Sequence, residues 1–238
     1  NHIGKGGHLS SQPMGALRDY VAKDPVTEKY SVLNFPVRKD NPYCIDLDET
    51  AGLLERFDPE LIILGKSMIL HPEPVAAIRK LLDVKSSRPL LLYDMAHVIG
   101  LIGQHFQDPF GEGADIVTGS THKTLFGSQR GIIGAIFEEE TPEFELWKAI
   151  QRRTFPGAVS NHHLGTLLGM LMAALEINAF KDTYQPQVLA NARAFAQALA
   201  DEGLEVQGDP DLGYTETHQV VVVVGYAQGC EIAKELEE

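Results

Sequence analysis

The chain has 238 residues, 44% of them hydrophobic, and a formal net charge of −13. This length and composition allow a buried core and predict a globular protein. The sequence excludes a nucleic-acid partner, because phosphate backbones are bound by clustered Lys and Arg side chains and no such cluster occurs. Cys44 and Cys230 fit neither a disulfide framework nor a metal site, which predicts a reducing, cytoplasmic setting.

The apolar runs and the two ends of the chain indicate where the protein is located and whether the chain is part of a longer one. No apolar run is expected to reach the length of a membrane span, and the first residues lack the order of a signal peptide. We therefore expect a soluble protein without a membrane partner. The chain opens at Asn1 without Met and closes on a helical pattern over 231–238, which predicts a piece of a longer protein.

Short apolar runs alternate with helical patterns in the first 140 residues. The runs at 61–64, 90–93, 116–117 and 132–137 lack polar alternation, which is typical of strands that helices cover on both faces. A helical period over 74–84 separates the first two runs. Strands that alternate with helices predict an α/β fold with a mostly parallel sheet covered by helices.

The pattern of apolar residues changes in the last third of the sequence. The segment 162–180 is so apolar that we expect a helix packed on several sides. A further helix is predicted over 187–201, and an apolar run follows at 220–224. These features predict a partial large domain over 1–180 and the start of a truncated, smaller C-terminal α/β domain over 181–238.

Asp94 and Lys123 carry the chemistry that the residues themselves suggest. Asp94 follows a buried strand, at the sheet edge where α/β proteins present groups to ligands, and Lys123 lies 29 positions further on. A pyridoxal phosphate enzyme needs a lysine amine for a Schiff base and an acid near the ring nitrogen. Taken singly, Asp94 suits a helix cap and Lys123 a solvated charge, and His97 and His122 suit ordinary core or loop histidines. The combination favours the cofactor pair.

Three strings carry a resemblance to a known family. They are GGHLS at 6–10, DMAH at 94–97 and THKTL at 121–125, in this order and at these separations. The chain thereby resembles serine hydroxymethyltransferases and their close relatives, over nearly its whole length and including FPG at 155–157. The resemblance implies the fold of pyridoxal phosphate enzymes of the aspartate aminotransferase type, with 1–180 as part of the cofactor-binding large domain.

The resemblance also implies roles for individual residues. Lys123 would hold pyridoxal 5'-phosphate as an internal aldimine, and Asp94 would pair with the pyridine nitrogen. His8 matches the histidine that stacks on the cofactor ring. His97 matches the histidine that lies close to the cofactor hydroxyl and the substrate.

Three more residues follow from the same resemblance. Ser67 resembles the serine near the phenolic oxygen of the cofactor, and a hydroxyl can hydrogen-bond a phenolate. His122 and Arg130 fall in the loop that lines the site. No metal site is expected, because the adjacent His162 and His163 point apart in a regular element and have no further ligand at suitable spacing.

The resemblance implies a homodimeric enzyme that transfers a hydroxymethyl group between serine and glycine, with tetrahydrofolate as the one-carbon acceptor. The chain departs from the family pattern at 10–12, in a lysine loop one residue longer than usual at 125–131, and at 158–163. These departures keep a second hypothesis open, a threonine aldolase or transaldolase-like enzyme or one that acts on α-methylserine. A third hypothesis, a non-catalytic paralogue, is disfavoured by the retention of Lys123 together with Asp94.

Overall fold

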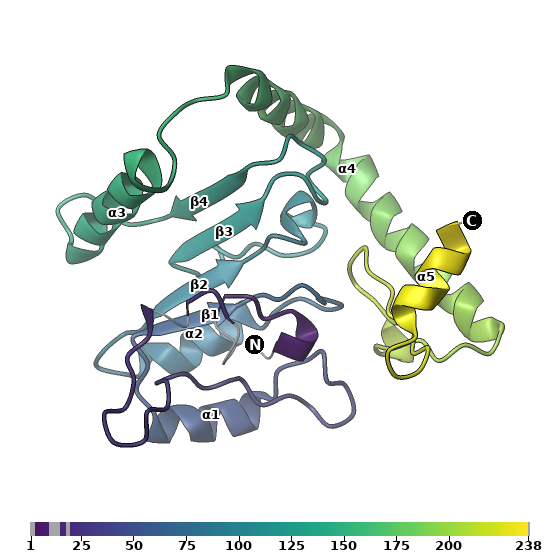
Figure 1. Ribbon diagram of the computed structural model, residues 1–238, viewed down its shortest axis with the longest axis horizontal. Helices are drawn as coiled ribbons and strands as arrows, with labels where there is room; N and C mark the ends of the chain where they lie inside the picture. The colour runs from purple at the N-terminus through teal and green to yellow at the C-terminus, as the bar shows by residue number, and fades with distance from the viewer. Residues whose placement is uncertain (1–2, 10–14, 18–19, 238) are drawn as a thin grey trace.

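A four-stranded sheet with the order β1-β2-β3-β4 organises the molecule (Figure 1). The computed structural model describes residues 3–9, 15–17 and 20–237. The first three strands pair in parallel, and the last pairs antiparallel to its neighbour. The predicted α/β fold with a mostly parallel sheet is confirmed. The strands are β1 (Leu61–Leu64), β2 (Leu90–Asp94), β3 (Ile116–Ser120) and β4 (Gly131–Ala135).

Side-chain caps mark the start of two of the helices. Asp46 caps α1 (Leu47–Arg56) by accepting a hydrogen bond from the backbone N–H of Glu49 at 2.9 Å. Thr141 caps α3 (Pro142–Arg152) in the same way. The helix α2 (Val75–Asp83) buries one face against the sheet. The remaining elements are η1 (Ile3–Lys5), η3 (Ile99–Leu101), η4 (Arg153–Ala158), α4 (Leu164–Asp201), η5 (Pro210–Leu212) and α5 (Gly229–Glu237).

The core lies between the first three strands and α2. Its fully buried large apolar side chains come from β1, the loop after β1, α2, β2 and the turn after β2, and they include Leu64, Ile69, Leu70, Val75, Ile78, Leu82, Leu91, Tyr93, Val98 and Leu101. The expectation that all four strands are buried on both faces is wrong for β4, in which Ile133 is 40% exposed. Nothing among the described residues covers β4 fully.

The helix α4 differs from the prediction in two ways. It is one continuous helix of 38 residues with Pro186 inside it, whereas two helices, 162–180 and 187–201, are expected from the sequence. It is also not packed on several sides by this chain. Six apolar side chains of its N-terminal half are more than half exposed: Leu164, Leu168, Leu171, Met172, Leu175 and Phe180. The division into 1–180 and 181–238 stays a prediction, and its boundary falls inside this helix.

The length and composition of α4 also correct a second expectation. By these two criteria alone, the helix is long and apolar enough to cross a membrane, so the expectation that no apolar segment reaches this length is wrong. The core helix of a soluble protein passes the same test. The feature is therefore weak evidence for a membrane.

The loop that carries Lys123 packs against η3 through a close backbone approach. A Cβ atom on Gly100 would lie 2.1 Å from the carbonyl oxygen of Thr124. The hydroxyl of Thr124 donates to the carbonyl of His97 and accepts from the N–H of Gly100, both at 3.0 Å. From α4, the amide of Gln185 donates to the carbonyl of Gly100 at 3.0 Å. A residue with a side chain at position 100 would push the lysine loop away.

We expect Gly100→Ala to lower the free energy of unfolding of the full-length protein by about 1 to 3 kcal/mol, because the added methyl group has no space beside the Thr124 carbonyl. Urea denaturation measures the change. Gly52→Ala is the matched control, since nothing lies within 4 Å of a Cβ atom there and alanine favours the helix. Equal effects of the two substitutions would contradict the packing argument.

Candidate active site

The predicted site residues gather at the carboxyl ends of the parallel strands. Ser67 follows β1, Asp94 is the last residue of β2, and Lys123 follows β3. Parallel strands present their carboxyl ends at one edge of the sheet, where ligands bind in α/β folds. The topology therefore brings these three residues to one edge.

Asp94 is a partly buried carboxylate with weak protein partners. Burial raises the pKa of its carboxyl group, and hydrogen bonds from the N–H of Ala96 at 3.2 Å and the hydroxyl of Thr118 at 3.4 Å act in the opposite direction. The positive charges of Lys123 and His8 also lower this pKa. No salt bridge to Asp94 occurs in the described part of the chain. The carboxylate is thus suited to a cationic ligand group.

His8 and Ser67 are joined although 59 positions separate them. The hydroxyl of Ser67 lies 3.1 Å from Nδ1 of His8, and the N–H of Ser67 donates to the carbonyl of Gly6 at 3.1 Å. Gly6 has a φ of +82°, and a Cβ atom on it would lie 2.3 Å from the Cβ of Ser67. Glycine is required here because the backbone crosses directly over Ser67. The exposed imidazole of His8 is held at the sheet edge.

His97 is a neutral imidazole at physiological pH. Burial lowers the pKa of its ring to about 4, and the nearby charges of Lys123, His218 and His8 act in the same direction. Nδ1 of this ring lies 3.4 Å from the amide nitrogen of Gln219. The ring can therefore serve as a hydrogen-bond donor and acceptor without carrying charge.

The loop after β3 presents an accessible lysine. The side chain of Lys123 is exposed, and its Nζ donates to the hydroxyl of Ser120 at 3.4 Å. His122 is exposed and makes no hydrogen bond or ion pair with the described residues. Arg130 is engaged elsewhere, since its guanidinium donates to the hydroxyl of Thr166 and to the carbonyl of His163 at the start of α4.

The structure thus brings together five of the seven predicted site residues, namely His8, Ser67, Asp94, His97 and Lys123. Two further residues, His218 and Gln219, lie beside His97 and were not expected from the sequence. No motif marks them, and they precede the apolar run that predicts the smaller domain. Among the residues that the structure describes, no cluster of His, Cys, Asp or Glu suits a metal ion.

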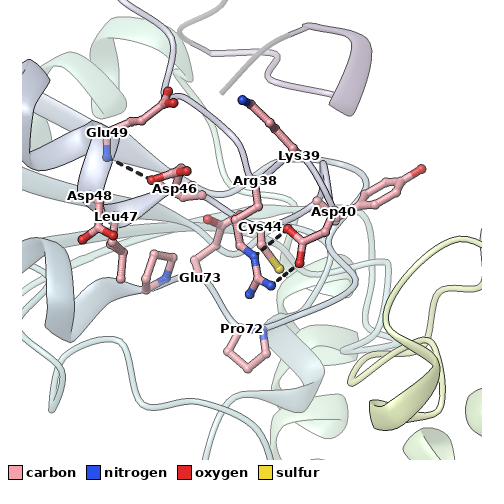
Figure 2. A pocket seen from close by; sticks show the side chains of 13 residues that line it. Arg38, Lys39, Asp40, Cys44, Asp46, Leu47, Asp48, Glu49, Pro72 and Glu73 are labelled. Atoms are coloured by element: carbon pink, nitrogen blue, oxygen red, sulfur yellow. Dashed lines mark hydrogen bonds and ion pairs between the residues drawn. The ribbon is translucent and has the colours of Figure 1, made fainter.

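A cavity of about 740 Å³ opens elsewhere, beside the N-terminal end of α1 (Figure 2). Two of its charged groups, Arg38 and Asp40, form an ion pair, and the carboxylate of Asp46 accepts a hydrogen bond from the backbone N–H of Glu49. None of the predicted site residues lines it. The lining residues are Arg38, Lys39, Asp40, Tyr43, Cys44, Ile45, Asp46, Leu47, Asp48, Glu49, Pro72, Glu73 and Pro74.

The order of the strands and the residues at the sheet edge define an α/β chain with the fold of pyridoxal-phosphate-dependent transferases. The chain belongs to the serine hydroxymethyltransferase family, whose model matches residues 2–230. It is 42% identical over 234 residues to a serine hydroxymethyltransferase of Archaeoglobus fulgidus, which covers 98% of this chain and 49% of the relative. It is 41% identical over 242 residues to a serine hydroxymethyltransferase of Korarchaeum cryptofilum, and this match covers 99% of this chain and 53% of the relative.

A solved structure supports the same assignment. The chain resembles the crystal structure of L-threonine transaldolase from Pseudomonas fluorescens in the internal aldimine state, with a TM-score of 0.72 and 36% sequence identity. The match covers 82% of this chain and 42% of that protein. The chain spans about half the length of the curated relatives that it matches.

The depressed pKa of His97 predicts a loss of stability in acid. An unfolded histidine binds its proton near pH 6.5, whereas the folded ring binds it only near pH 4. The unfolded state therefore binds more protons between these values, and stability falls as the pH drops from 6.5 towards 4. In the full-length protein, we expect His97→Gln to remove roughly 1 to 2 kcal/mol of this acid-induced loss, allowing for solvent screening.

Urea denaturation at pH 7 and at pH 4.5 measures this difference. The exposed His122 gives the control, because His122→Gln removes an imidazole without hydrogen-bond or ion-pair partners among the described residues. If both variants kept the acid dependence of the parent protein, His97 would not be the group responsible.

Proposed function

We propose that the whole protein, of which this chain is a part, binds pyridoxal 5'-phosphate on Lys123 and transfers a hydroxymethyl group between serine and glycine, with tetrahydrofolate as the one-carbon acceptor. One observation carries the proposal. Lys123 and Asp94 meet at the same sheet edge, close enough for the lysine charge to act on the pKa of the carboxyl group. The family membership of the chain agrees with this chemistry.

The residues present fit this cofactor. When bound, pyridoxal phosphate supplies an electron sink for the bond that breaks at the substrate α-carbon. The amine of Lys123 is exposed and available for covalent attachment. The partly buried carboxylate of Asp94 has no salt-bridge partner among the described residues, and it would hold a proton on the pyridine nitrogen.

The imidazoles would flank the cofactor in different ways. His8 is held by Ser67 and offers a flat, exposed ring for stacking. The hydroxyl of Ser67 would hydrogen-bond the phenolic oxygen. His97, which stays neutral, would donate a hydrogen bond to an oxygen of the cofactor or substrate. We also place His122 and Arg130 at the rim.

Arg130 reaches the cofactor only if its guanidinium gives up the hydrogen bonds to Thr166 and to the carbonyl of His163. The role of this side chain therefore depends on movement at the start of α4. The departures at 158–163 lie next to this point in the sequence.

A second candidate function has its own support. The solved structure that the chain resembles is named an L-threonine transaldolase and is 36% identical. The same lysine and acid would serve a threonine aldolase or transaldolase-like reaction, or one on α-methylserine, because these reactions also break or form bonds at the α-carbon. The two candidates differ in the substrate and in the acceptor.

Turnover of the full-length protein separates these candidates. We expect faster conversion of serine with tetrahydrofolate than of threonine with an added aldehyde. Lys123→Ala should lose both reactions, because the cofactor then lacks its covalent tether. Conversion of threonine with the aldehyde, without conversion of serine with tetrahydrofolate, would favour the second candidate.

Borohydride reduction of the full-length protein gives an independent check of the attachment point. Peptide mapping should find the label on Lys123. Lys66 is the internal control, because its ammonium group is buried in an ion pair with Glu73 and is not available for attachment. Label on Lys66 would contradict the assignment.

We further propose that the full-length protein is a cytoplasmic homodimer and that the apolar face of α4 lies at the interface. Six large apolar side chains in the N-terminal half of this helix are more than half exposed in the chain. Burial of such a face is favourable by roughly 25 cal/mol per Å² of apolar surface. The family resemblance, in which two subunits build each site, points to the same partner.

Sedimentation of the full-length protein tests this assembly. We expect a dimer, and we expect Leu168→Lys with Leu175→Lys to yield monomers that have lost cofactor. Leu236→Lys is the control, because this side chain is 82% exposed on a different helix, α5. A monomer that keeps both cofactor and activity would show that one chain builds the site.

A further inference from the structure

A segment near the end of the chain, 215–219, is tied along the loop that follows β1. The hydroxyl of Thr217 donates to the carbonyl of Ile69 at 2.7 Å, and the hydroxyl of Thr215 donates to that of Leu70 at 3.3 Å. Both threonines are buried. These bonds join residues almost 150 positions apart and hold Gln219, which lies two positions after Thr217, beside the candidate active site.

The side-chain amide of Gln219 can take only one orientation. Its oxygen accepts a hydrogen bond from the N–H of Ile69 at 2.7 Å, because that backbone group can only donate. Its nitrogen donates to the carbonyl of Ser67 at 2.7 Å, because a carbonyl can only accept. The same nitrogen carries a second hydrogen, and Nδ1 of His97 lies 3.4 Å from it. The group that faces Nδ1 of His97 is therefore a hydrogen-bond donor, the side-chain amide nitrogen of Gln219.

We infer that Gln219 is a positioning residue that selects the tautomer of His97, with Nδ1 as the acceptor and the proton on Nε2. In the neutral ring one nitrogen donates and the other accepts, so a donor at Nδ1 places the proton on the opposite nitrogen. Nε2 has no hydrogen bond among the described residues, which leaves its proton available to the active site. The use of that proton on an oxygen of the cofactor or substrate rests on the proposed function.

The surroundings of the ring support a single neutral tautomer. Burial and the charges of Lys123, His218 and His8 together oppose protonation of the imidazole. A protonated ring would carry N–H groups on both nitrogens and would point one of them at the amide hydrogen of Gln219. Gln219 therefore disfavours the charged form as well as the alternative tautomer.

Two substitutions at position 219 test the inference in opposite ways. Gln219→Glu places an acceptor where the amide donor stands, so we expect the proton to move to Nδ1 and the pKa of His97 to rise. Gln219→Met removes the donor without adding charge, so we expect a mixture of both tautomers. Gln151→Glu is the control, because that glutamine is exposed on α3.

The readout is ¹⁵N NMR of the full-length protein with labelled histidine rings, in which His97→Gln identifies the signal of His97. This measurement needs neither cofactor nor substrate. We expect the parent protein to show a protonated Nε2. In the transfer assay, Gln219→Met should lower kcat/KM about twofold near neutral pH, because a part of the molecules then presents no donor at Nε2 of His97. Gln219→Glu should move the acidic limb of the pH profile upwards.

Two results would overturn the inference. One is a parent protein with the proton on Nδ1. The other is an unchanged tautomer in Gln219→Met while the free energy of unfolding falls, which would leave Gln219 as a brace for the loop after β1. If Gln219→Glu does not fold, the methionine variant decides. A protein with the expected tautomers but no transfer activity would refute the proposed function and leave this inference standing.

Discussion

The candidate site depends on one close contact between two pieces of backbone, at Gly100 and Thr124. Only the absence of a side chain at position 100 lets the turn after β2 lie against the loop after β3. The hydroxyl of Thr124 then joins both pieces, through the carbonyl of His97 and the N–H of Gly100. The acid and imidazole of one loop and the lysine of the next are consequently set side by side.

Burial shifts the pKa values of Asp94, at the end of β2, and of His97, in the turn that follows, in opposite directions. It raises the pKa of the Asp94 carboxyl group and lowers that of the His97 imidazole, because both groups lose hydration in their charged forms. The positive charges nearby oppose the first shift and reinforce the second. The positive charge of Lys123 therefore favours the charged form of Asp94 and, at the same site, the neutral form of His97.

The strands and the positions of Asp94 and Lys123 near strand ends could be predicted because their signals are local. Apolar runs mark β1 to β4, Asp94 is the last residue of β2, and Lys123 lies three positions after the end of β3. The exposure of α4 could not be predicted, because an apolar face does not say which chain covers it. The bonds of Arg130 to the start of α4 and of Gln219 to His97 join segments 33 or more positions apart, and no motif announces them.

The path of the segment 215–219 has a consequence for the order in which the protein is made. The groups that approach His97 come from both early and late parts of the chain, since Gln219 is translated 122 positions after it. A growing chain that has emerged only as far as α4 holds the lysine and the acid but lacks the residue that orients the imidazole. Contacts of such long sequence separation form slowly, because the intervening chain must first be ordered. The hydrogen bond that orients His97 therefore cannot form until the segment 215–219 has been made, after all four strands of the sheet.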